Sequence, residues 1–216
     1  MIGIGLATCG RPSYAAAAYA SITEHMPAGC LLTVEEDVKR AGVATVKNKL
    51  LSRLLDDGCE WLFLCEDDVR VVSPLAVTGY IAAAEAENVK HLMFHGHGPH
   101  NPAPLLNLGL VTVWPNWVGA WALYHRDALL DVGLMDENFV NAYEHVEHSL
   151  RLAQAGHTVP MLGAADATGS EAWLQEQPGS FETSVIRNDP HWLEKTQAAR
   201  AYWEATYPDT YRMVFK

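Results

Sequence analysis

Residues 61–69 read Trp61-Leu62-Phe63-Leu64-Cys65-Glu66-Asp67-Asp68-Val69, a short apolar run that ends abruptly in three adjacent carboxylates. The first five residues carry no charged side chain, which predicts a strand that is buried on both faces and lies at the centre of a parallel sheet. Three neighbouring acids repel one another, and burial raises the cost of ionising each of them. We therefore expect a positive group beside Glu66, Asp67 and Asp68.

The position of these acids also predicts a ligand. In an open α/β sheet, ligands bind at the carboxyl ends of the strands, which is where the three acids lie. A hard divalent cation that prefers oxygen ligands and is bound together with a phosphate fits both the charge and the position. The alternative is a solvated acidic turn, such as the start of a helix after Asp68.

The composition limits the classes of function. The chain has 216 residues, of which 49% are hydrophobic, and this suffices for one domain with a substantial core. A net charge of −11 without a basic cluster is a poor match for a nucleic-acid backbone. We expect no signal peptide and no membrane span, because no charged segment precedes the apolar residues 1–9 and no apolar stretch is long enough.

The cysteines indicate a compartment. Cys9, Cys30, Cys59 and Cys65 lie far apart, in or beside apolar runs. This distribution is typical of reduced core cysteines in a cytoplasmic protein, and not of a disulfide framework or a zinc knuckle.

Strands and helices alternate along the first 70 residues. Strands are predicted at 2–7, 30–34 and 61–65, and helices at 13–25, capped by Ser13, and at 43–55. Such alternation predicts an α/β fold with a mostly parallel central sheet and helices on both faces. It also brings the loops 8–12, 35–37 and 66–68 to one edge of the sheet, which predicts a binding site there.

Gly3 and Gly5 do not form a dinucleotide-binding fingerprint, because they lie inside the first strand and position 8 is Thr. After residue 70 we expect helices at 73–87, 126–133, 143–155 and 192–203, and short strands at 91–95, 108–114 and 158–162. Gly156 is a typical C-terminal cap for the third of these helices, and a loop is expected from Gly163 onward.

An ordered set of motifs resembles one known family. The set comprises Thr8 and Arg11-Pro12, acids after the second strand, Lys47-Asn48, Glu66-Asp67-Asp68, Gly133-x-x-Asp136-Glu137-x-Phe139 and Tyr143-Glu144…Arg151-Leu152…Gly156. It resembles nucleotide-sugar glycosyltransferases of the GT-A fold, of the family-two type. The resemblance implies a Rossmann-like, GT-A-type catalytic and nucleotide-sugar-binding domain over residues 1–170, with 171–216 as a helical extension packed on it.

The resemblance also implies a donor site. Asp68, with Asp67 or Glu66 beside it, would hold Mn²⁺ or Mg²⁺, which neutralises the departing nucleoside diphosphate. The expected nucleotide contacts are Thr8 and Arg11, with Glu35, Glu36 or Asp37 at the base or ribose and Lys47 and Asn48 lining the pocket. For Lys47, Glu36 and Asp37, the alternative is a solvated surface.

The acceptor hydroxyl must lose a proton as it attacks the sugar, and the resemblance implies inversion with a carboxylate as general base. This chain reads Glu144-His145 where the family usually has Glu-Asp. Glu144 is our first choice for the base and His145 the second, since imidazole titrates near neutrality. Alternatively, Glu144 only stabilises the start of a helix. Arg151 is expected to pair with an acid of this segment.

The third metal ligand and the histidine loop are less defined. Family members often place a His after the last strand, but residues 163–170 contain none, so Asp166 is the candidate ligand there. His95, His97 and His100 share a glycine-rich loop, which we interpret as an acceptor-side or donor-lid loop, with a zinc site as the alternative. Trp114 and Trp117 flank a turn and are candidates for stacking on a sugar, although aromatic residues more often lie in a core.

Two other functions remain open at this stage. A degenerate member could bind a nucleotide or a glycan without turnover, and the histidine loop could belong to a zinc hydrolase. Nucleotidyl transfer is disfavoured, because residues 7–13 lack the glycine-rich basic loop of that class. The acceptor hydroxyl could belong to a glycan, a protein or a modified base, although the acidic charge disfavours nucleic acid.

Overall fold

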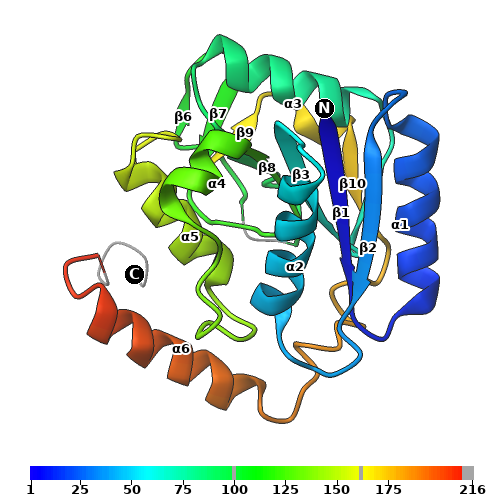
Figure 1. The fold of residues 1–216 in the computed structure, drawn as a ribbon. Helices are drawn as coiled ribbons and strands as arrows, with labels where there is room; N and C mark the ends of the chain where they lie inside the picture. The colour runs from blue at the N-terminus through cyan, green and yellow to red at the C-terminus, as the bar shows by residue number, and fades with distance from the viewer. Residues whose placement is uncertain (99–100, 161–162, 211–216) are drawn as a thin grey trace.

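A five-stranded sheet forms the centre of the molecule in the computed structural model, which describes residues 1–98, 101–160 and 163–210. The strand order is β2-β1-β3-β8-β5, from Leu31–Glu36, Ile2–Thr8, Trp61–Glu66, Trp121–His125 and His91–Met93. β1 pairs in parallel with β2 and β3, whereas β8 runs antiparallel to β3 and β5. Four strands therefore run in one direction and β8 runs in the other, which makes the sheet mostly parallel. β3 lies at the centre of the sheet, as the sequence predicts (Figure 1).

Helices cover both faces of this sheet because the side chains of β3 alternate between two cores. Phe63 and Cys65 pack with α1 (Pro12–His25) and α3 (Leu75–Ala86), while Leu62 and Leu64 pack with α2, α4 and α5. The last three helices span Val43–Asp56, Arg126–Val132 and Glu144–Gln154. All four β3 side chains are at most 1% exposed. The predicted α/β architecture, with a strand buried on both faces, is confirmed.

The glycines of β1 let α2 approach the sheet closely. A Cβ atom at Gly3 would lie 2.6 Å from both Cys59 Sγ and Leu54 Cδ2, and one at Gly5 would lie 3.0 Å from Leu50 Cβ. Both distances are shorter than ordinary van der Waals contact. Gly3 and Gly5 thus serve packing between a helix and a strand, which agrees with their rejection as a dinucleotide motif.

Two smaller sheets flank the central one. β4 (Val69–Val71) pairs with β10 (Leu174–Glu176), and β7 (Val111–Trp114) pairs with β6 (Leu106–Asn107) and β9 (Ala164–Ala167). The strand expected at 158–162 is wrong for residues 158–160, and 161–162 lie outside the described residues. The strand instead lies at β9, where a loop was expected. β9 is fully buried, but its sequence Ala-Ala-Asp-Ala lacks the branched apolar residues that mark strands.

The start of α1 also differs from the prediction. The helix begins at Pro12 with Arg11 before it, so Ser13 is its second residue and does not cap it. Proline suits the first position because its missing N–H has no partner in the first turn. This shift places Arg11 at the end of the β1 loop, facing the carboxyl edge of the sheet.

The C-terminal part of the chain returns to that same edge. The pairing of β10 with β4 brings residues 174–176 beside the strand that follows the acidic cluster. α6 (Trp192–Thr206) then packs through Ala199 and Trp203 against Phe139 and α5. Figure 1 shows α6 below α5, and the coil that leads into α6 below the ends of β1 and β2. No helix among the described residues is long and apolar enough to cross a bilayer.

Gly3→Ala is expected to lower the free energy of unfolding by about 1–3 kcal/mol, because the added methyl overpacks the contact between β1 and α2. Leu54→Ala alone should cost about 2–5 kcal/mol by leaving a cavity. In the double variant the new methyl enters that cavity, so urea denaturation should give a loss smaller than the sum of the two. A strictly additive loss would contradict this contact.

Candidate active site

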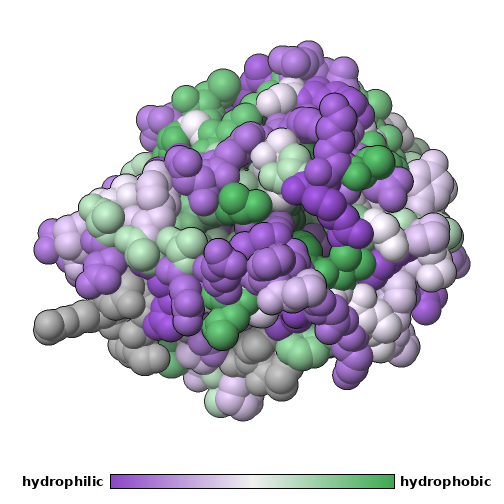
Figure 2. All heavy atoms as spheres, turned by 90° about the horizontal axis from the view of Figure 1, so that it is seen from below, coloured by the Kyte–Doolittle hydropathy of each residue, from purple (hydrophilic) through white to green (hydrophobic). Residues whose placement is uncertain are grey.

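A cleft of about 490 Å³ opens at the carboxyl ends of β1 and β3. Its walls come from the loop after β1, the end of β3, the loop 116–120, the residues 141–146 at the start of α5, and the segment 184–196 that leads into α6. Figure 2 views the molecule from this side, where hydrophilic and hydrophobic side chains intermingle. Of the predicted site residues, eight line the cleft: Thr8, Arg11, Asp37, Glu66, Asp67, Asp68, Glu144 and His145.

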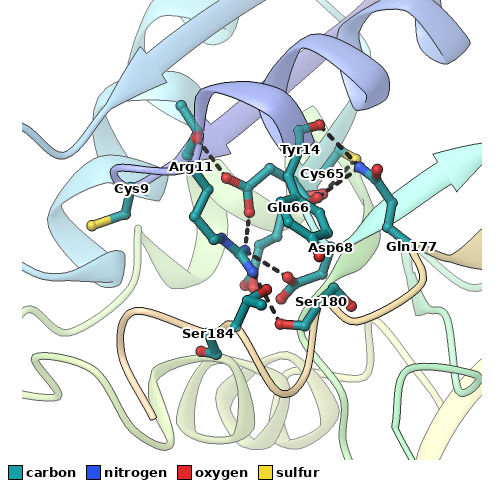
Figure 3. Close-up of polar contacts among 12 residues, drawn as sticks. Cys9, Arg11, Tyr14, Cys65, Glu66, Asp68, Gln177, Ser180 and Ser184 are labelled. Atoms are coloured by element: carbon teal, nitrogen blue, oxygen red, sulfur yellow. Dashed lines mark hydrogen bonds and ion pairs between the residues drawn. The ribbon is translucent and has the colours of Figure 1, made fainter. Parts of the chain in front are cut away.

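The acids after β3 are buried and share one guanidinium. Arg11 Nη2 contacts both Asp67 Oδ1 and Asp68 Oδ1, the latter at 2.5 Å, and Thr8 Oγ1 donates to Asp67 Oδ2 at 2.5 Å. Figure 3 shows the Arg11 side chain extending toward Asp68. The side chains of Asp67 and Asp68 are only 3% and 10% exposed. The expected positive group is therefore present, and the alternative of a solvated acidic turn is wrong.

Arg11 does not balance this negative charge fully. Burial raises the pKa of Asp67 to about 6, even though Thr8 and Arg11 oppose the rise. Burial and the neighbouring Glu66 raise the pKa of Asp68 to about 6 as well. Two buried carboxylates that resist ionisation beside a third acid form a site where a further cation is stabilised. One oxygen of Asp68 faces Arg11 and the other faces the histidine loop.

The C-terminal segment completes the wall around these acids. Gln177 Nε2 donates to the backbone oxygen of Asp67 at 2.8 Å, and Arg11 Nη1 donates to the backbone oxygen of Ser180 at 3.1 Å (Figure 3). Arg187 also lines the cleft, and its charge opposes the rise in the pKa of Asp68. The sequence alone does not single out these residues, because the polar segment 171–191 has no periodicity or motif.

Lys47 lies beneath the cleft and does not line it. Its ammonium is 2.5 Å from Glu66 Oε1 and 3.3 Å from Glu144 Oε1, and the side chain is 1% exposed. Burial alone would lower the pKa of Lys47, but the two carboxylates outweigh it and raise the pKa, so the lysine stays charged. The alternative of a solvated surface is wrong for this residue, and its direct contact with a nucleotide has no support from its position.

Glu144 and His145 form a second polar pair in the cleft. His145 Nδ1 lies 3.0 Å from Glu144 Oε1, and the imidazole is 20% exposed. Burial alone would raise the pKa of Glu144, but His145 and Lys47 lower it to about 2, which makes this carboxylate a weak base. A Cβ atom at Gly119 would lie 2.9 Å from His145 Cγ, so a glycine makes room for the ring.

The acids after β2 divide between surface and cleft. Glu35 pairs with Lys49 at 3.0 Å on the outer face of α2, and neither it nor Glu36 lines the cleft. Asp37 lines the cleft and accepts backbone hydrogen bonds from residues 41 and 42. It therefore holds the turn into α2, and this is the only one of the three acids within reach of a ligand there.

Asn48 and Arg151 hold the segment before α5. Asn48 exchanges hydrogen bonds with the backbone of Met135 and donates to Glu137, and it does not line the cleft. Arg151 pairs with Glu147 at 2.6 Å and donates to the backbone oxygens of residues 132 and 134. The expected pairing of Arg151 with an acid of this segment is present. Both residues fix the loop that precedes Glu144.

Asp166 is engaged in the core. Its carboxylate is 0% exposed, and it accepts hydrogen bonds from Tyr80, Ser170 and the backbone of His95, with His95 Nδ1 2.6 Å away. It is absent from the cleft lining. Its position therefore offers no support for a role as metal ligand and identifies a buried hydrogen-bond network instead.

The histidine loop separates into two parts. The His95 ring stacks on one face of Trp114 with centroids 3.6 Å apart. Trp117 lines the cleft, and Trp114 does not. His97 lines the cleft beside Asp68. His100 lies outside the described residues.

The donor atoms at the cleft fit a divalent cation that shares its ligands with a phosphate. Within the described ranges, no three His, Cys, Asp or Glu side chains are grouped so that they alone could hold a metal. Mg²⁺-type sites need only one or two carboxylates when substrate phosphates and water complete the coordination. Asp68, with its uncompensated charge and its second oxygen directed away from Arg11, meets that requirement.

Lys47→Met is expected to lower the free energy of unfolding by about 3–5 kcal/mol, because the buried Glu144 and the partly exposed Glu66 lose their shared buried partner. Lys49→Met is the matched control on the same helix. Its pair with Glu35 is exposed and should contribute about 0–1 kcal/mol. Chemical denaturation of both variants tests this, and equal losses would contradict the buried network.

Comparisons with known proteins identify the fold. No protein-family profile and no curated protein matches the sequence. One similar structure is a mannosyltransferase from Pyrobaculum calidifontis in complex with GDP-Man and Mn²⁺. The alignment spans 94% of this chain and 75% of the mannosyltransferase, with 13% identity and a TM-score of 0.51. Another is a Drosophila β1,4-galactosyltransferase 7 variant in complex with manganese, UDP-Gal and xylobiose. This alignment spans 85% of this chain and 74% of the galactosyltransferase chain, with 13% identity and a TM-score of 0.54.

Staphylococcus aureus TarS residues 1–349, in complex with UDP, cover 100% of this chain and 75% of their own, with 12% identity and a TM-score of 0.52. At such low identity, these similarities establish architecture. The chain has the fold of GT-A-type nucleotide-sugar glycosyltransferases, as the sequence motifs imply.

Proposed function

We propose that this protein is a glycosyltransferase that moves a sugar from a nucleoside diphosphate to a hydroxyl acceptor, with Mn²⁺ or Mg²⁺ as cofactor. The observation that carries the proposal is the buried Asp67–Asp68 pair, with its uncompensated charge, at the carboxyl edge of a GT-A-type sheet. The structural neighbours named above were solved with GDP-Man, UDP-Gal or UDP, and two of them with manganese, which supports the same ligand class here.

The donor would lie along the end of β1 and β3. Asp68 would be the main metal ligand, because Asp67 is engaged by Thr8 and Arg11 and Glu66 is paired with Lys47. When bound, the metal ion neutralises charge on the leaving diphosphate. Arg11 and Arg187 would add positive charge on the phosphate side, and Asp37 would accept hydrogen bonds from the ribose or base.

His145 fits the role of general base better than Glu144 does. Lys47 keeps the carboxylate of Glu144 ionised, and this carboxylate accepts a hydrogen bond from His145 Nδ1. The other ring nitrogen, Nε2, is then available to take the proton of the acceptor hydroxyl. A carboxylate that orients a histidine in this way fixes its tautomer and stabilises the charged ring. The acceptor hydroxyl would therefore transfer its proton to His145 Nε2 as its oxygen attacks the anomeric carbon with inversion.

The proposal is tested with a panel of UDP-, GDP-, CDP- and TDP-sugars and Mn²⁺, with mass spectrometry to detect the transferred or hydrolysed sugar. The correct nucleotide at about 100 times its dissociation constant should add roughly 2.7 kcal/mol of stability, which a thermal shift detects. Asp68→Asn should lose both turnover and the shift while keeping its fold. Binding without turnover across the panel and several acceptors would favour a binding module, and unchanged turnover of Asp68→Asn would refute the proposal.

His145→Gln should lower kcat by about 10²–10⁴-fold with little change in nucleotide binding, because only the proton acceptor is lost. Glu144→Gln should lower kcat less, since the imidazole remains. The control is His157→Gln, a histidine that pairs with Asp131 and does not line the cleft. If both variants fold and Glu144→Gln loses more kcat than His145→Gln, the general base is Glu144 and not His145.

A further inference from the structure

His97 occupies an unusual position in the cleft. It follows β5 and is 5% exposed, and its Nδ1 is buried without a hydrogen-bond partner in the described part of the chain. The ring lies between two carboxylates: Nε2 is 3.5 Å from Asp68 Oδ2, and Nδ1 is 3.4 Å from Glu176 Oε1. A buried imidazole is normally hydrogen-bonded, so this arrangement requires an explanation.

The distance between His97 and Asp68 fits two ligands of one ion. Two donor atoms that each lie about 2.1 Å from a metal are about 3.0–3.5 Å apart at octahedral to tetrahedral angles. The same distance is long for a hydrogen bond. Arg11 holds the Oδ1 atom of Asp68, so the Oδ2 atom that faces His97 remains available without breaking that ion pair.

The other side of the imidazole faces a carboxylate: Glu176 lies within ion-pair distance of Nδ1 but forms no hydrogen bond with it among the described residues. Metal-ligating histidines usually donate their second N–H to a carboxylate, which fixes the tautomer. Glu176 stands at this position, and its own carboxylate is held by the backbone N–H of Gly98 at 3.0 Å and by Ser180 Oγ at 3.2 Å. Three chain segments distant in sequence thus converge: the end of β3, the loop after β5, and β10.

We propose that His97 Nε2 and Asp68 Oδ2 ligate the same divalent ion, with Glu176 orienting the imidazole. This assignment rests on the proposed function for the metal site itself and specifies the ion it takes. Imidazole nitrogen suits transition-metal ions, whereas Mg²⁺ prefers oxygen ligands. The site therefore selects Mn²⁺ or a related transition-metal ion over Mg²⁺.

The test uses the full chain with Mn²⁺ alone and then with Mn²⁺ plus UDP, GDP, CDP or TDP. Electron paramagnetic resonance measures free Mn²⁺, and electron spin-echo modulation detects ¹⁴N coupled to bound Mn²⁺. The wild type should show imidazole ¹⁴N modulation, which His97→Gln should lose together with about tenfold or more of its Mn²⁺ affinity. His145→Gln, which alters the other imidazole of the cleft, should keep the modulation. In His97→Gln, Mg²⁺ should displace Mn²⁺ at a concentration that is lower by a similar factor.

The outcomes separate this inference from the proposed function. Mn²⁺ that binds through Asp68 without ¹⁴N modulation, or with modulation that persists in folded His97→Gln, overturns the role of His97 and leaves a glycosyltransferase metal site intact. Wild-type protein that binds no Mn²⁺ under any of these conditions overturns both the ligand assignment and metal dependence. The wild-type spectrum with the His145→Gln control decides the question even if His97→Gln does not fold, because the cleft lining contains no further histidine among the described residues.

Discussion

The structure depends on an excess of negative charge that is buried where β3 ends. Asp67 and Asp68 follow a strand with no exposed face, so they cannot turn fully into solvent, and Glu66 adds a third acid beside them. Arg11, from the loop after β1, offsets part of this charge by pairing with both aspartates. The remaining imbalance makes the cleft suitable for a cation and a phosphate.

Lys47 links the two halves of the cleft. Its single ammonium pairs with Glu66 on the donor side and with Glu144 on the side of His145. Because the ammonium is buried, changing one carboxylate alters the partner of the other. The lysine thus lies between the proposed diphosphate site and the proposed proton acceptor, and it does not line the cleft itself.

The sequence predicted the parts of the fold that arise from local periodicity. Apolar patterns predicted strands at 61–65 and 2–7, where the structure has β3 at 61–66 and β1 at 2–8, and they predicted the apolar stripe of α2. The acidic edge followed from the order of these elements. Contacts between segments that are distant in the sequence could not be predicted from local patterns. Nothing local marks Gln177 or Glu176 as neighbours of the acids after β3, and the Ala-rich β9 lacks a strand pattern. Nothing in the sequence indicates that Asp166 lies in a buried network with Tyr80 and Ser170.

We propose above all that the acidic end of β3 binds a diphosphate through a divalent ion. The decisive measurement is anomalous diffraction from crystals grown with Mn²⁺ and a nucleoside diphosphate. We expect a manganese peak within coordination distance of Asp68, with phosphate density on the far side of the ion. A peak elsewhere, or nucleotide density away from this edge with Asp68 still paired only to Arg11, would refute the proposal.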